Sequence, residues 1–184
     1  MNELNIARVL PVAEIGGSVD QLAILFDDHY DRLYRLARRL TASADDALDL
    51  VQETFLKAAR YPRSIPVGFA SEEAWLVRVL INIRRDQWRR TLRRKRFEAS
   101  ESGKSLAAPA NGDLEGALIA RTSVWKALDE LSPRRHAIVV MRELEGLSIP
   151  AIASLLGISQ ITVRWHLSMG RRELTTALKA FTEE

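Results

Sequence analysis

The feature that most constrains this 184-residue chain is the spacing of its apolar residues, which recur at steps of three and four. Such spacing places apolar side chains on one face of a helix, whereas a half-buried strand needs strict alternation. From Asp20 the pattern runs through Leu22, Leu25, Phe26, Tyr30, Leu33, Leu36, Ala37 and Leu40. No segment of the sequence has the pattern of a strand. The sequence therefore predicts an all-α fold.

Local signals divide this pattern into helices. Ser43 can cap a helix that continues to about Arg60, where Tyr61 and Pro62 end it. After a loop, Ser71 can cap the next helix. Residues 75–83 of that helix are apolar nearly all round, so we expect it to lie in the middle of a helical bundle.

Composition indicates two small helical domains joined by a flexible linker. Residues 1–20 lack a clear period and form an N-terminal extension, and the first domain covers 21–96. Residues 97–113 are the predicted linker, because the stretch from Ala99 to Asp113 is rich in Ser, Ala, Gly and Pro without an apolar period. Helical patterning resumes at Leu114, and the second domain covers 114–184.

Charge is distributed unevenly, although the net charge is only +3. From Arg84 to Arg96 there are seven Arg and one Lys against the single acid Asp86, which predicts a phosphate-binding surface. The plainer alternative is an exposed charged helix end. Acidic residues concentrate instead between Asp27 and Glu53. That surface would suit a basic protein partner, or it is an ordinary solvated face.

The stretch from Ser148 to Leu167 has the spacing of a helix-turn-helix. Ser148 can cap a short helix, Gly157 suits the left-handed turn after it, and Ser159 can cap a second helix. The second helix is then free to enter a DNA major groove. A plain helical hairpin with a solvated polar face is the alternative.

Several side chains of this second helix suit contacts with DNA. Arginine can pair with guanine, glutamine with adenine, and threonine can touch a thymine methyl group. The candidate readers are Gln160, Thr162, Arg164, Trp165 and His166. Arg171 and Arg172 are better placed to contact phosphates.

Three motifs carry a resemblance to ECF (extracytoplasmic function) sigma factors. Residues 131–148 resemble the segment that leads into the promoter-reading helix-turn-helix of that family, although LuxR-type response regulators have a similar module. Residues 46–58 look like the polymerase-binding helix of the family, and residues 75–86 look like the helix that follows it. The motifs occur in the family's order, and the resemblance covers roughly residues 21–180.

The resemblance implies an RNA polymerase sigma factor that binds core polymerase and promoter DNA and is held by an anti-sigma factor. The expected core-polymerase contacts are Asp45, Asp49, Gln52 and Glu53. The expected contacts with the −10 region are Asn82, Arg84, Arg85, Arg89 and Arg90. The expected contacts with the −35 region are Ser159, Gln160, Thr162, Arg164, Trp165, His166, Arg171 and Arg172.

Two details of the resemblance leave alternatives open. Asn82 matches the base-capturing position of the family, but taken alone it could be a polar spot in a buried helix. The family often has a small and a basic residue where this chain has Trp165 and His166, and a basic-alanine pair at Met169 and Gly170. These departures put the upstream promoter sequence in doubt.

Other classes of function find little support in the sequence. The chain has no cysteine, which excludes disulfides and thiolate metal sites, and its three histidines are far apart. There is no phosphate-binding glycine loop and no nucleophile motif, so we expect neither an enzyme nor a metal or cofactor site. No signal peptide or membrane span is evident, which predicts a cytoplasmic protein. The rival functions are a stand-alone helix-turn-helix regulator and an anti-sigma or adaptor protein.

Overall fold

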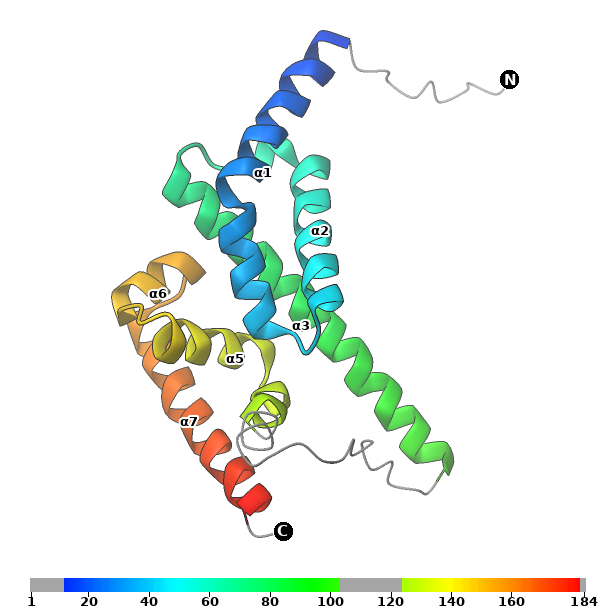
Figure 1. The fold of residues 1–184 in the computed structure, drawn as a ribbon, viewed down its shortest axis with the longest axis vertical. Coiled ribbons are helices and arrows are strands. Elements are labelled where there is room, and N and C mark those ends of the chain that lie inside the picture. The colour runs from blue at the N-terminus through cyan, green and yellow to red at the C-terminus, as the bar shows by residue number, and fades with distance from the viewer. Residues whose placement is uncertain (1–11, 103–123, 183–184) are drawn as a thin grey trace, which may run out of the picture.

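The computed structural model describes residues 12–102 and 124–182, which form helices and short turns without a strand among them (Figure 1). The N-terminal half consists of α1 (Val12–Leu40), α2 (Ala44–Arg60), a 3-10 turn (Pro62–Ser64) and α3 (Phe69–Ser102). The C-terminal half consists of a helix over 124–130, α5 (Pro133–Val139), a π-helical segment (Val140–Leu144), α6 (Ile149–Leu156) and α7 (Gln160–Thr182). The all-α prediction is confirmed. None of the described helices is long and apolar enough to cross a bilayer.

Helix α2 begins and ends as its sequence predicts. The hydroxyl oxygen of Ser43 accepts a hydrogen bond of 3.0 Å from the backbone N–H of Asp46, which satisfies a donor of the first turn. At the other end, the N–H of Tyr61 donates to the carbonyl of Lys57 at 3.0 Å, and Pro62 follows. Proline has no N–H to donate, so the helix ends there.

The predicted start of α3 at Ser71 is wrong, because the helix begins two residues earlier at Phe69. The carbonyl of Gly68 accepts from the N–H groups of both Ser71 and Glu72 at 2.9 Å, so Ser71 already lies inside the first turn. The side chain of Glu72 in return accepts from the N–H of Gly68 at 3.1 Å. Gly68 has a φ of 106°, which favours glycine at this position.

Two helices extend beyond the predicted domain limits. Helix α1 begins at Val12, inside the expected N-terminal extension, and α3 continues to Ser102, inside the expected linker. Residues 97–102 contain neither proline nor glycine, so nothing in them stops the helix before Gly103. The rest of the predicted linker and the pattern at Leu114 lie outside the described residues.

Helix α3 is the central helix, as its apolar stretch predicts. Leu76, Val77 and Leu80 have no exposed surface. The helix contacts α1 and α2 in its own half and α5 and α6 in the other half. The N-terminal bundle is therefore completed on one side by the C-terminal half.

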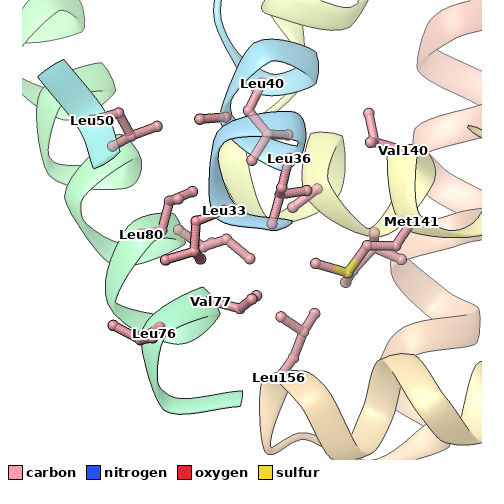
Figure 2. Packing of buried hydrophobic residues seen from close by; sticks show 14 of the residues in the cluster. Leu33, Leu36, Leu40, Leu50, Leu76, Val77, Leu80, Val140, Met141 and Leu156 are labelled. Atoms are coloured by element: carbon pink, nitrogen blue, oxygen red, sulfur yellow. The ribbon is translucent and has the colours of Figure 1, made fainter. Parts of the chain in front are cut away.

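A single apolar cluster runs through both halves of the molecule (Figure 2). Leu33 and Leu36 of α1 and Val77 of α3 face Met141 of the π-helical segment and Leu156 of α6 across it. Val140 and Met141 are fully buried beside them. Burial of apolar surface is the main favourable contribution to folding. We call the part of this cluster that lies between the two halves the inter-half seam, and the packed state of the two halves the closed arrangement. The seam therefore stabilises the closed arrangement.

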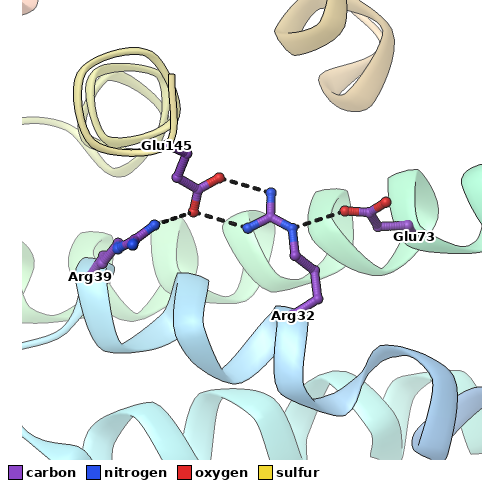
Figure 3. Close-up of polar contacts among 4 residues, drawn as sticks. All are labelled: Arg32, Arg39, Glu73 and Glu145. Atoms are coloured by element: carbon purple, nitrogen blue, oxygen red, sulfur yellow. Dashed lines mark hydrogen bonds and ion pairs between the residues drawn. The ribbon is translucent and has the colours of Figure 1, made fainter. Parts of the chain in front are cut away.

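A buried carboxylate joins the halves at the edge of the seam (Figure 3). Arg32 of α1 donates two hydrogen bonds to Glu145, at 2.9 and 2.8 Å, and a third to Glu73 of α3 at 3.0 Å. Arg39 donates to the same Glu145 carboxylate at 2.8 Å. The Glu145 side chain is only 6% exposed. Burial lowers the pKa of Arg32, but hydrogen bonds and charge from Glu145 and Glu73 outweigh it and raise that pKa above its ordinary value.

A buried histidine also lies at the seam. His136 of α5 is 3% exposed and lies against the backbone of Arg39 in α1. Burial, reinforced by the positive charge of Arg84, lowers the pKa of His136 to about 4. The imidazole is therefore neutral at pH 7.

We expect Glu145→Gln to lower the free energy of unfolding by about 1–3 kcal/mol, because Arg32 and Arg39 lose their shared counter-charge. Glu143→Gln is the matched control. Glu143 pairs with Arg171, but these side chains are 44% and 60% exposed, so its loss should change stability by less than about 1 kcal/mol. Urea denaturation measures both variants. Equal losses would show that the Glu145 cluster adds no more than a surface ion pair.

We expect His136 to contribute a pH dependence to stability. Its folded pKa, about 4, lies below the ordinary value of 6.5, so between these values the unfolded chain binds the proton first. The contribution of His136 to the free energy of unfolding is fully present above pH 6.5 and falls by about 2–4 kcal/mol as the pH approaches 4. His136→Gln should flatten this part of the stability profile. A variant with the wild-type slope between pH 4 and 6.5 contradicts the assignment.

Candidate nucleic-acid interface

The predicted acidic face of α2 is exposed to solvent. Asp45, Asp49, Gln52 and Glu53 all lie on it, while Leu50, Val51 and Phe55 are buried on the opposite side. The side-chain amide of Gln87, from α3, lies 3.4 Å from Glu53. The helix thus uses its apolar face for the bundle and leaves its carboxylates available to a partner.

A groove of about 310 Å³ between α2 and α3 brings both signs of charge together. Its lining includes Glu53 and Lys57 from α2 and Asp86, Gln87 and Arg90 from α3. The acidic face of α2 and the basic end of α3 therefore meet along one edge.

The basic run on α3 divides into two groups. Arg89 and Arg90 are exposed, as a phosphate-binding surface requires. Arg84 and Arg85 are half-buried. The guanidinium of Arg84 donates to the carbonyl of Leu40 at 3.0 Å and faces Asp129 of the C-terminal half at 3.7 Å. Arg84 therefore participates in the closed arrangement as well as lying in the basic run.

Asn82 lies half-buried on α3, about two turns before the exposed arginines Arg89 and Arg90. Its side-chain amide makes no hydrogen bond with any residue that the structure describes. Because the residue is only half-buried, its amide can be reached from solvent.

Helices α6 and α7 form the predicted helix-turn-helix. The hydroxyl of Ser148 accepts from the N–H of Ala151 at 3.3 Å, and Gly157 adopts the left-handed conformation with a φ of 64°. Ser159 accepts from the N–H of Thr162 at 3.1 Å and caps α7. The helix-turn-helix follows from local sequence, because each capping serine bonds to a backbone N–H only three residues further along the chain.

The solvent face of α7 differs from the predicted set of readers. Gln160, Arg164 and Trp165 are exposed as expected. Thr162 is half-buried, and its hydroxyl lies 2.8 Å from that of Ser159, so it belongs to the cap. Ile161, which was not among the candidates, is 76% exposed.

His166 differs from the exposed readers beside it. Its side chain is half-buried rather than fully presented to solvent. Burial, followed by the charges of Arg135 and Arg134, lowers the pKa of His166, so the ring is neutral at pH 7. It therefore carries no positive charge toward a phosphate.

The later part of α7 carries the two arginines that the sequence predicts to contact phosphates. Arg171 and Arg172 are exposed, and the guanidinium of Arg171 donates to Glu143 at 2.6 and 3.1 Å. Gly170 explains one departure from the family pattern. A Cβ at this position would lie 2.7 Å from Cγ2 of Val139, so glycine permits the close approach of α5 and α7.

Among the described residues, no three His, Cys, Asp or Glu side chains gather in a way that could hold a metal ion.

Comparisons with known proteins cover both halves of the chain. The model of Sigma-70 region 2 matches residues 25–94, and the model of Sigma-70 region 4 matches residues 121–174. The first region contains α2 and most of α3, and the second contains the helix-turn-helix.

Similar proteins include SigE of Mycolicibacterium smegmatis and SigL of Mycobacterium tuberculosis, both ECF RNA polymerase sigma factors. SigE is 34% identical over 87% of this chain, which spans 62% of its length. SigL is 33% identical over 84% of this chain, which spans 87% of its length.

Two solved structures share the fold. Sigma factor RpoE, solved with the anti-sigma factor NepR from Bartonella quintana, has a TM-score of 0.54 at 24% identity, covering 87% of this chain and 95% of its own. CnrH, solved with the cytosolic domain of CnrY, has the same TM-score and identity, covering 86% and 88%. With two region models in order and close relatives along most of its length, this chain belongs to the ECF RNA polymerase sigma factors.

Proposed function

We propose that this chain binds core RNA polymerase through the acidic face of α2 and directs it to promoters through α3 and α7. The observation that carries the proposal is the placement of exposed charge. Asp49, Gln52 and Glu53 face solvent on α2, while Arg89 and Arg90 face solvent on α3. Carboxylates suit a basic protein surface, and guanidinium groups suit phosphates.

In this proposal, α7 binds the −35 element and α3 acts at the −10 element. The first turns of α7 enter the major groove, where Gln160 and Arg164 meet base edges. Arg89 and Arg90 hold phosphates of the −10 region. Asn82 binds an unstacked base by its free amide, which offsets part of the few kcal/mol that unstacking costs.

The two halves must separate for both elements to be bound at once. Elements centred about 25 base pairs apart lie roughly 80 Å apart on B-form DNA, at 3.4 Å per base pair. In the closed arrangement, Arg78 of α3 donates to the carbonyl of Leu155 in α6 at 3.3 Å. Residues 103–123 could span at most about 70 Å when extended, which together with the helices allows the separation. We propose that binding to polymerase and promoter opens the inter-half seam.

We also propose that an anti-sigma protein regulates this chain in the cytoplasm. RpoE and CnrH share its fold, and RpoE was solved with the anti-sigma factor NepR while CnrH was solved with the cytosolic domain of CnrY. An inhibitor that holds the seam closed would keep the −10 and −35 surfaces from reaching their separate elements.

A stand-alone helix-turn-helix regulator is the main alternative and is less favoured. It would need neither the exposed acidic face of α2 nor the basic end of α3. Run-off transcription with purified core polymerase separates the two functions. A sigma factor yields promoter-specific transcripts that depend on this chain. Specific binding to duplex DNA by the chain alone, without such transcripts, would support the regulator instead.

We expect Asp49→Arg to reduce the affinity for core polymerase at least tenfold, because it places a cation where the partner is basic. Asp49 is exposed, so the variant should keep its stability. Asp20→Arg makes the same charge change at an exposed position on α1, outside the acidic stretch from Asp27 to Glu53, and serves as the control. Fluorescence anisotropy with labelled chain measures both affinities. Equal affinities for the two variants would remove the α2 face from the polymerase interface.

A further inference from the structure

The first turns of α7 present an apolar strip to solvent. Val163 and Leu167 are buried and define the inner side of the helix. At 100° per residue, Ile161 and Trp165 lie about 40° apart on the side opposite to that pair. They are 76% and 53% exposed. Together they form a ridge of apolar surface, the Ile161–Trp165 ridge.

The tryptophan of this ridge is held in place. The guanidinium of Arg135, from α5, lies 5.6 Å from the centre of the Trp165 ring, at the range of a cation–π contact. Arg135 is itself ion-paired with Glu173, and its side chain is only 15% exposed. The ring of His166 meets Trp165 edge-on at 4.9 Å. A side chain held in this way loses little conformational freedom when it meets a ligand.

The surroundings of the ridge favour DNA as its occupant. Gln160 and Arg164 are exposed beside it, and Arg171 and Arg172 are exposed further along the same helix. At 100° per residue, Gln160, Arg164 and Arg171 lie along one side of the ridge, where they suit base edges and phosphates next to an apolar contact. The helix-turn-helix presents the N-terminal turns of its second helix to the major groove, and the ridge lies within those turns.

The apolar character of the ridge limits which bases it can recognise. In the major groove, thymine alone presents a methyl group, which lies beside its O4 acceptor, whereas the edges of adenine, guanine and cytosine are distinguished by their hydrogen-bonding groups. If the apolar ridge covered a hydrogen-bonding group of a base, that group would lose its water without gaining a hydrogen-bond partner, which costs free energy. A thymine methyl group is instead stabilised by the contact.

We propose that the Ile161–Trp165 ridge reads thymine methyl groups in the −35 duplex and makes this chain select thymine where it lies. The inference rests on the proposed function, because it requires α7 to bind the −35 element. It assigns recognition to apolar contacts in the first turns of α7. The polar side chains of Gln160 and Arg164 then act along one side of the ridge.

The first experiment identifies the preferred bases. Core polymerase with the full chain transcribes a promoter library whose −35 element is randomised, and the transcripts are sequenced. We expect enriched thymines with the wild-type chain. This preference should be lost in the double variant Ile161→Ser with Trp165→Ser and retained in Trp165→Phe, which keeps an aromatic surface. Both residues are exposed, and unchanged urea denaturation would show that the variants are folded.

The second experiment removes only the methyl group. Each selected −35 thymine is replaced by deoxyuridine, which keeps the same hydrogen-bonding groups. We expect transcription or holoenzyme affinity to fall about fourfold for each contacted methyl group with the wild-type chain, and not to change with the double serine variant.

Three results would overturn or separate the claims. Equal use of thymine and deoxyuridine by the wild-type chain overturns the ridge as a methyl reader. A double variant that loses core polymerase affinity, with no change in base preference, shows instead that the ridge docks on protein. The absence of any chain-dependent transcript from the library contradicts the proposed sigma function itself, and is thereby distinguished from failure of the ridge.

Discussion

The carboxylate of Glu145 is the interaction on which the closed arrangement depends. It accepts hydrogen bonds from Arg32 and Arg39, which lie 113 and 106 positions earlier in the sequence. The carboxylate is buried, so its charge requires these partners. Around it, the inter-half seam, which includes Leu33, Met141 and Leu156, excludes water and stabilises the contact between the two halves by the hydrophobic effect, which has no preferred direction. The ion pairs then determine how the two halves are oriented.

This arrangement explains how one small chain carries surfaces of opposite charge. The closed seam uses one side of α1 and α3 and leaves the carboxylates of α2 exposed on another. Arg84 belongs to both systems, since it lies in the basic run and also faces Asp129 of the other half. The ion pair between the Arg84 guanidinium and Asp129 competes with an ion pair between the same guanidinium and a DNA phosphate. Opening the seam therefore increases the positive charge available to DNA.

Features encoded by neighbouring residues could be predicted from the sequence. The caps at Ser43 and Ser148 and the turn at Gly157 depend on contacts within a few residues, so their positions follow from local chemistry. The start of α3 did not follow from Ser71, because the reciprocal contact between Gly68 and Glu72 starts the helix two residues earlier, at Phe69. The seam could not be predicted, since helical periodicity does not say which faces of distant segments meet. Ile161 was missed because its apolar side chain has none of the hydrogen-bonding groups that pair with base edges.

The most direct test of this account is the distance between the halves during transcription. The chain has no cysteine, so Arg35→Cys and Ala151→Cys, on opposite walls of the groove between the halves, can carry a fluorescent donor and acceptor. We expect efficient energy transfer in the free chain and a large decrease when the labelled chain forms an active promoter complex with core polymerase. Transfer that stays equally efficient in complexes that produce transcripts would contradict this expectation.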